Sequence, residues 1–207
     1  MVKTNVYVDG FNLYYGAVKD TPYKWLDLHK LCTLLLPKND IHRIRYFTAP
    51  VQNTLKDPTK SQRQQTYIRA LETLPNLSVH YGSFLSSKVR MPLVAPTQGR
   101  RNALVVKTEE KGSDVNLASL LLADAFRQDY EVAVVVSNDS DLVLPIKIVT
   151  TELHLPVGLL NPHPRFAVEL VKVATFKKQI RKGVLVASQF PQTLSDTKGA
   201  ITKPTAW

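Results

Sequence analysis

Four aspartates stand where carboxylates could act together: Asp9, Asp114, Asp139 and Asp141. Asp9 directly follows the apolar run NVYV, and the last two follow VAVVVSN, so both groups come at the end of an expected strand. Ligands of open parallel sheets bind beyond the carboxyl ends of the strands. Two adjacent, parallel strands would therefore bring three acids to one edge, although a single Asp after a strand more often makes a turn or caps a helix.

The position of Asp114 favours one site formed by all four aspartates over four separate turn residues. Ser113 is the expected N-cap of a helix over residues 113–128, which places Asp114 in the first turn. Helical spacing sets Leu117 and Leu121 on the face that Asp114 shares, so we expect its carboxylate to point toward the sheet edge. Crowded, half-buried carboxylates need a counter-charge, and a hard divalent cation such as Mg²⁺ or Mn²⁺ supplies it.

The charge pattern fits a cation site in a protein that binds a polyanion. The net charge is +10, yet residues 114–141 carry −5, whereas segments 83–113 and 142–207 carry +4 and +6. A basic surface attracts nucleic acid, but an acidic centre would repel phosphate unless a cation neutralised it. Solubility alone would account for the net charge equally well.

The chain has the length of one domain with a tail. Its 207 residues, 44% of them hydrophobic, suffice for one sizeable core, and we predict a domain over residues 1–187 and an extended tail over 188–207. The sequence contains neither a membrane span nor a signal peptide, so we expect a soluble, cytoplasmic protein. A single cysteine and five histidines without paired spacing argue against a disulfide framework and a zinc site.

Apolar runs alternate with helical stretches, as in strands joined by crossover helices. We expect an α/β fold with a central, mostly parallel sheet of about five strands. The expected strands are 4–8, 42–49, 77–82, 131–138 and 155–160, and the expected helices are 25–36, 61–74 with Ser61 as N-cap, 113–128, 141–152 and one or two basic helices within 166–180. Residues 83–110 instead indicate a β-hairpin insertion with a basic tip, an arm that could contact substrate.

Three segments resemble the acidic motifs of a known family. YVDGFNLYYG, EKGSDVNLASLLLADAF and VVVSNDSDLVLPI are similar to those of the NYN domain, in particular its bacterial LabA-like branch within the PIN-like nuclease group. The resemblance implies a three-layer, Rossmann-like PIN-like fold with strand order 3-2-1-4-5 and metal-dependent endonucleolytic cleavage of RNA. It also implies that the four aspartates ligate the metal and that Asn12 supports the first of them.

Together these observations predict a ribonuclease that hydrolyses phosphodiester bonds with metal-activated water and leaves a 5′-phosphate and a 3′-hydroxyl. Mg²⁺ or Mn²⁺ is the expected cofactor and RNA, single-stranded rather than duplex, the expected partner; a homodimer is left open. The expected substrate-binding residues are Asn12, Lys111, Ser137, Asn138, Arg100 and Arg101. Lys111 and Asn12 also have ordinary interpretations, as a solvated loop lysine and a turn residue.

Other functions are compatible with parts of the pattern. A PIN-like RNA-binding or assembly module would keep the fold without turnover. A metal-dependent glycosyltransferase also carries D-x-D after a Val-rich strand, but it would not need Asp9 and Asp114 at the same edge. A haloacid-type phosphatase would need an acid where Phe11 stands, and a nucleoside triphosphatase would need a glycine-rich loop after a strand. Tyr14, Tyr15 and Trp25 could stack on bases, although core packing is the commoner use of such residues.

Overall fold

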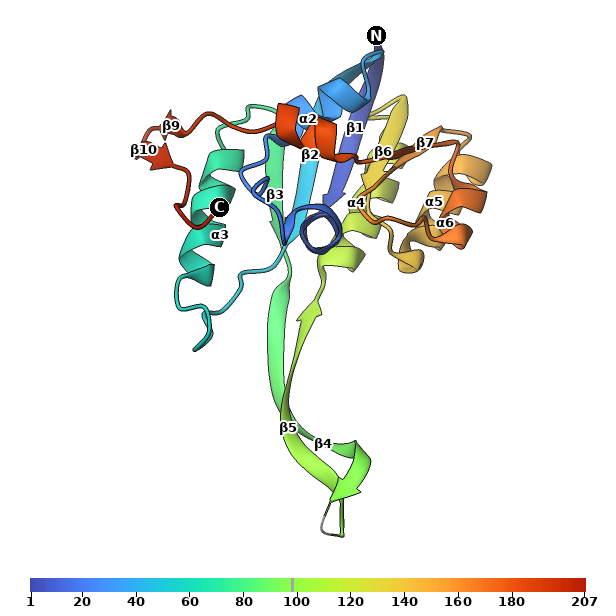
Figure 1. The fold of residues 1–207 in the computed structure, drawn as a ribbon. Helices are drawn as coiled ribbons and strands as arrows, with labels where there is room; N and C mark the ends of the chain where they lie inside the picture. The colour runs from blue at the N-terminus through green and yellow to red at the C-terminus, as the bar shows by residue number, and fades with distance from the viewer. Residues whose placement is uncertain (98) are drawn as a thin grey trace.

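The structure is a computed structural model that describes residues 1–97 and 99–207. Its centre is a sheet of six strands: β1 (Val2–Asp9), β2 (Asn39–Thr48), β3 (Leu77–Tyr81), β6 (Val132–Val136), β7 (Val157–Asn161) and β8 (Phe176–Gln179). All neighbours pair in parallel, in the order β3-β2-β1-β6-β7-β8 (Figure 1). Counted along the chain, the first five strands of this sheet follow the expected order 3-2-1-4-5, and β8 adds a sixth at the edge.

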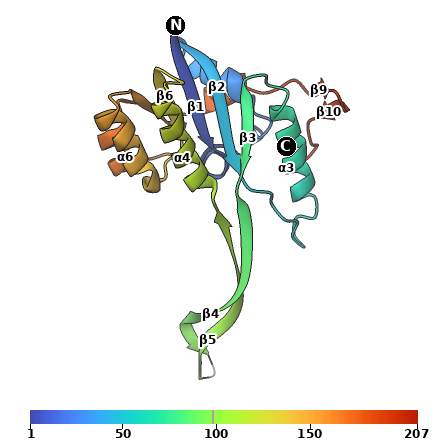
Figure 2. The same ribbon diagram turned by 180° about the vertical axis from the view of Figure 1, so that it is seen from behind.

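Helices cover both faces of the sheet, which makes the predicted three layers (Figures 1 and 2). One face packs against α1 (Gly10–Leu13), the π-helical turn η1 (Tyr14–Val18), α2 (Leu28–Leu35), α3 (Lys60–Leu71) and α7 (Lys182–Ala187). The other packs against α4 (Ser113–Phe126), η2 (Ser140–Leu142), α5 (Val143–Lys147), η3 (Ile148–Glu152) and α6 (Val168–Val173).

The central strands are apolar on both faces because both faces are covered. In β1, Val6 and Val8 join the core on the side of α2, and Tyr7 between them joins the core on the side of α4. Such alternation follows from the two-residue period of a strand. The run VAVVV in β6 is buried from Ala133 to Val136, as expected for a central parallel strand.

A buried ion pair fixes α4 against the sheet. Arg45 of β2 donates two hydrogen bonds to the Asp124 carboxylate, over 2.7 and 2.8 Å, and the Tyr7 hydroxyl donates a third over 2.7 Å. A bidentate pair of this kind has a defined geometry. It therefore holds the helix whose first turn carries Asp114.

The hairpin insertion predicted over residues 83–110 is present and extends to Lys111. Its strands are β4 (Ser83–Thr97) and β5 (Arg100–Lys111), and they pair from Ser83 with Lys111 out to Thr97 with Arg100. It leaves the body where β3 ends and α4 begins, and it projects away from the carboxyl edge of the sheet (Figures 1 and 2).

Two predicted helix caps are wrong. Helix α3 begins after Thr59, and Ser61 lies in its first turn, where its amide donates to Asn53 Oδ1 over 2.9 Å. Helix α4 begins after Gly112, whose φ of 97° lies in the left-handed region that glycine adopts without strain, and Ser113 is already helical. A serine near a helix start is not enough to place the cap.

Two predicted helices also differ from the structure. Residues 140–152 are helical without a gap, but in succession as η2, α5 and η3 instead of one α-helix, and Pro145, which lacks an amide hydrogen, lies in the first turn of α5. Residues 166–180 are not one basic helix, since α6 ends at Val173 and β8 follows as an edge strand. Its exposed Lys177 and Lys178 suggest a helix face in the sequence, but lysines are equally typical of an edge strand.

The C-terminal segment folds against the body. It contains the antiparallel hairpin of β9 (Thr193–Asp196) and β10 (Gly199–Thr202). Arg69 of α3 donates two hydrogen bonds to Asp196, and the rings of Phe190 and Trp207 lie 5.7 and 6.3 Å from that of Trp25. The boundary at residue 187 stays a prediction. Within the part of the chain that is described, no helix has the length and apolar character needed to cross a bilayer.

Candidate carboxylate site

Asp9 is the most deeply placed of the four aspartates. It ends β1 and caps α1, and only 5% of its surface is exposed. Its Oδ1 accepts a hydrogen bond from the Asn12 amide over 2.9 Å, and its Oδ2 accepts one from the Ser137 hydroxyl over 3.0 Å. Burial raises the pKa of Asp9, and these two bonds oppose the rise because they favour the charged form.

The loops after β1 and β6 are tied to each other by side chains that we predicted to bind substrate. Asn12 Oδ1 accepts from the Asn138 amide over 2.9 Å, and Ser137 Oγ also accepts from the Asp139 amide over 3.1 Å. The Asn138 side chain donates to the Arg165 carbonyl and accepts from the Ala167 amide. Asn12, Ser137 and Asn138 therefore position the acidic loops, and a direct role with substrate stays a prediction.

Asp114 lies among the other acids. Its pKa is raised to about 6, first by burial and then by the charges of Asp9, Asp139, Glu110 and Asp141, in that order. These carboxylates come from β1, α4, β5 and the loop after β6, and the parallel pairing of β1 with β6 brings their carboxyl ends to one edge. The expected grouping of Asp9, Asp114, Asp139 and Asp141 is thus visible in the electrostatics of Asp114.

Asp139 and Asp141 begin the turn after β6. The Asp139 Oδ1 accepts from the Asp141 amide over 2.9 Å, so this acid caps η2. Its second oxygen accepts no hydrogen bond from the described residues, and Asp141 is exposed in the first turn of η2. Capping takes only one oxygen of Asp139, so the other can serve as a ligand.

The predicted basic contacts lie at opposite ends of the hairpin. Lys111 sits at its base, next to the start of α4, with Nζ 3.2 Å from Glu109 Oε2 and a largely exposed side chain. Arg100 and Arg101 lie at its tip, about 35 Å from Lys111 along β5 at the usual rise per residue. The structure brings Lys111 near the acids and does not bring Arg100 and Arg101 there.

Glu110 is a fifth acid at this edge, and it was not expected from the sequence. It belongs to β5, its Oε1 accepts from the Ser113 amide over 3.1 Å, and it acts on the pKa of Asp114. An acid three residues before the start of a helix can accept a hydrogen bond from the first helical amide, as Glu110 does. Glu110 is the first residue of the second acidic motif, but its position at the end of an expected hairpin strand gave no reason to place its side chain among the acids.

The donor set suits a hard divalent cation. It offers oxygen ligands alone, and no Lys, Arg or His in the described residues forms an ion pair with any of the four aspartates. The described residues contain no group of three or more acidic, His or Cys side chains already at ligand distance. Binding would therefore draw the carboxylates inward, with the cation's attraction replacing the repulsion that raises the pKa of Asp114.

The fold and this acidic edge define an α/β protein of the PIN-like class. Residues 3–178 match the model of the NYN domain, a span that includes every strand and helix that carries an acid of the site. The chain belongs to the NYN domain family, as the motifs predicted. Membership of the LabA-like branch stays a prediction.

Two comparisons add detail. The chain is 31% identical over 237 aligned residues to a Pseudomonas putida protein named 6-hydroxy-3-succinoylpyridine 3-monooxygenase, with all of this chain and 75% of that protein covered. It is also similar to the crystal structure of a protein of unknown function from Vibrio parahaemolyticus, with a TM-score of 0.57 and 15% identity over 87% of this chain and 94% of the other. At that identity the second likeness concerns the fold alone.

Proposed function

We propose that this protein is a metal-dependent endoribonuclease. The observation that supports the proposal is the gathering of Asp9, Asp114, Asp139 and Asp141 at one sheet edge in a member of a nuclease-like family. Four carboxylates without a basic partner among the described residues are costly to keep together unless a cation binds them. The net charge of +10 would attract an RNA backbone to that edge.

The residues of the site have distinct tasks in this proposal. The four aspartates would hold Mg²⁺ or Mn²⁺, which lowers the pKa of water and neutralises charge that develops on phosphate oxygens. Ser137 and the Asn12 amide favour the charged form of Asp9 and orient its carboxylate. Lys111, at the base of the hairpin, can exchange its contact with Glu109 for a phosphate of the RNA.

A cleavage assay tests the proposal. Single-stranded RNA labelled at one end is incubated with the protein in Mn²⁺ and in EDTA. We expect internal cuts in Mn²⁺ only, with 5′-phosphate products. RNA binding without cleavage in either condition would point instead to a PIN-like binding module without turnover.

A second candidate function comes from the Pseudomonas relative, whose name gives it 3-monooxygenase activity on 6-hydroxy-3-succinoylpyridine. The observation that favours it is the 31% identity over the whole of this chain. A monooxygenase consumes O₂ and a reductant. Oxygen uptake that requires both this pyridine and NADH or NADPH would support this candidate, and its absence together with RNA cleavage would exclude it.

A further inference from the structure

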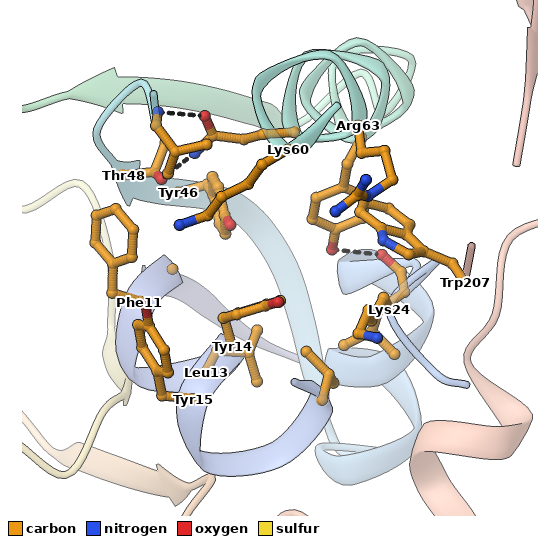
Figure 3. A pocket seen from close by; sticks show the side chains of 16 residues that line it. Phe11, Leu13, Tyr14, Tyr15, Lys24, Tyr46, Thr48, Lys60, Arg63 and Trp207 are labelled. Carbon is orange, nitrogen blue, oxygen red and sulfur yellow. Dashed lines mark hydrogen bonds between the residues drawn. The ribbon is translucent and has the colours of Figure 1, made fainter. Parts of the chain in front are cut away.

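A pocket lies beside the carboxylate edge, between α1 with η1 and the first half of α3 (Figure 3). The centres of water-sized molecules can occupy about 90 Å³ of it. Its wall begins at Gly10, the residue after Asp9, and includes Tyr46, whose pKa is raised by burial and then by the charge of Asp9. The pocket and the acids are therefore neighbours.

Aromatic rings form much of the wall. Phe11, Tyr14 and Tyr15 come from α1 and η1, and Trp207 lies at the opposite side of the pocket (Figure 3). Tyr67 belongs to α3 and packs against Trp207, with ring centroids 5.9 Å apart. Tyr15 is 55% exposed and meets Tyr14 edge to face at 5.2 Å, so our expectation of core packing is wrong for Tyr15. Half-open rings of this kind offer stacking platforms for a flat ligand.

Three cations line the same pocket: Lys24, Lys60 and Arg63. Neither lysine forms an ion pair within the described part of the chain. Arg63 binds Asp57 over 2.6 Å, but its buried Nε has no hydrogen-bond partner among the described residues. Among the described residues, the lining contains these three cations and no carboxylate, and the acids whose charges reach its tyrosines, Asp9, Asp20 and Asp57, lie outside it. The lining therefore suits an anionic ligand.

We propose that this pocket binds one nucleotide of a single-stranded RNA, with the base against the rings of Tyr14, Tyr15 and Trp207 and a phosphate against Lys60 and Arg63. The inference rests on the proposed ribonuclease function and gives that function a substrate subsite. Gly10 lines the pocket and directly follows Asp9 in the chain. The next phosphate of an RNA bound in the pocket would therefore lie close to the acids.

A small aromatic acid, like a nucleotide, combines a flat ring with an anionic group. It carries a single carboxylate, however, whereas the pocket presents three cations and includes Gly10, the neighbour of Asp9 at the acidic edge. A nucleotide fills both the ring platform and the cation cluster. Binding measurements with nucleotides and with an aromatic acid distinguish these two kinds of ligand.

The test is a titration of the full chain in EDTA, followed by tryptophan fluorescence, because Trp207 lines the pocket. The probes are AMP, UMP, a five-nucleotide RNA and nicotinate. Lys60→Glu is the main variant, since a negative charge in the first turn of α3 does not weaken that helix. Lys24→Glu is the second, and Lys147→Glu, exposed on α5 across the sheet, is the matched control.

We expect saturable binding of the nucleotides and the RNA, weakened about tenfold or more in Lys60→Glu and Lys24→Glu and unchanged in Lys147→Glu. Asp139→Asn should bind AMP as the native chain does in EDTA, which separates this subsite from the nuclease proposal. Absence of nucleotide binding, equal affinities in all three lysine variants, or binding of nicotinate without nucleotides would each overturn the assignment.

Discussion

The hydroxyl of Ser137 donates a hydrogen bond to Oδ2 of Asp9 over 3.0 Å, joining the carboxyl ends of β1 and β6. These strands are neighbours in the sheet, so the bond connects the first acidic motif to the third. It also favours the charged form of Asp9 against the burial that raises the pKa of this acid. Ser137 is therefore a positioning residue for the proposed cation site.

Ser137→Ala should weaken metal binding without unfolding the protein. The pKa of Asp9 rises further when the bond is removed, and removal of a partner that orients a ligand typically lowers metal affinity by about tenfold or more. Mn²⁺ titration followed by thermal unfolding measures the change, with Ser140→Ala, an exposed neighbour, as control. Equal Mn²⁺ affinities in the two variants would contradict this role.

Metal-free protein should lose stability as the pH rises through the range in which Asp114 ionises. The pKa of this acid is about 6 in the folded protein against an ordinary value of 3.8, so the folded state binds more protons between these values. Stability then falls with pH across that window and levels off above it. The raised pKa of Asp9 acts in the same direction.

Asp114→Asn should reduce this dependence to the part that Asp9 contributes. At pH 7 in EDTA the variant should be more stable than the native chain by about 1 kcal/mol, a figure reduced for the solvent exposure of a half-buried group. Urea unfolding from pH 4 to 8 measures the difference, with the exposed Asp40→Asn, at the opposite edge, as control. A free energy of unfolding of the native protein that rises with pH across this window would contradict the prediction.

Five of the six strands of the sheet could be predicted from the sequence, because apolar runs alternate with helical stretches. A short, continuous apolar run such as VAVVV in β6 is typical of a buried strand. The strand order 3-2-1-4-5 was predicted from the family resemblance. The edge strand β8 escaped detection because half-exposed strands with lysines share their composition with basic helices. The caps at Thr59 and Gly112 depend on backbone conformation, which composition does not fix.

The site was predictable to a similar degree. Asp9, Asp139 and Asp141 follow strands, and Asp114 begins an apolar helix face, so their meeting could be expected from topology. Glu110 and the pocket lined by Lys60 and Arg63 could not, because they depend on where β5 and α3 lie in space. The side chain of Asn138 forms its hydrogen bonds with residues distant in the chain, so they could not be predicted from the local sequence.

The hairpin tip should contribute to RNA affinity through charge alone. Arg100 and Arg101 lie far from the acids along β5 and are exposed, so they can bind phosphates without affecting the cleavage site. Charge reversal of both should weaken binding of a long single-stranded RNA. It should also reduce the salt dependence by roughly one unit of slope for each phosphate that the arginines no longer bind.

Fluorescence anisotropy at several salt concentrations measures both effects, and Arg127→Glu, exposed at the far end of α4, serves as control. Binding that does not respond to salt, or equal weakening in the control, would exclude an electrostatic arm.

The central claim is that the aspartate edge binds a divalent cation that is required for cleavage, and the most direct test is thermal unfolding of Asp139→Asn with and without Mn²⁺. The amide keeps the shape of the side chain but removes a charge that the cation needs, so native protein should gain stability from Mn²⁺ and the variant much less. RNA cleavage should fall about a hundredfold or more. Equal Mn²⁺ stabilisation in both proteins, with undiminished cleavage by the variant, would show that Asp139 only caps η2 and that the proposed site is wrong.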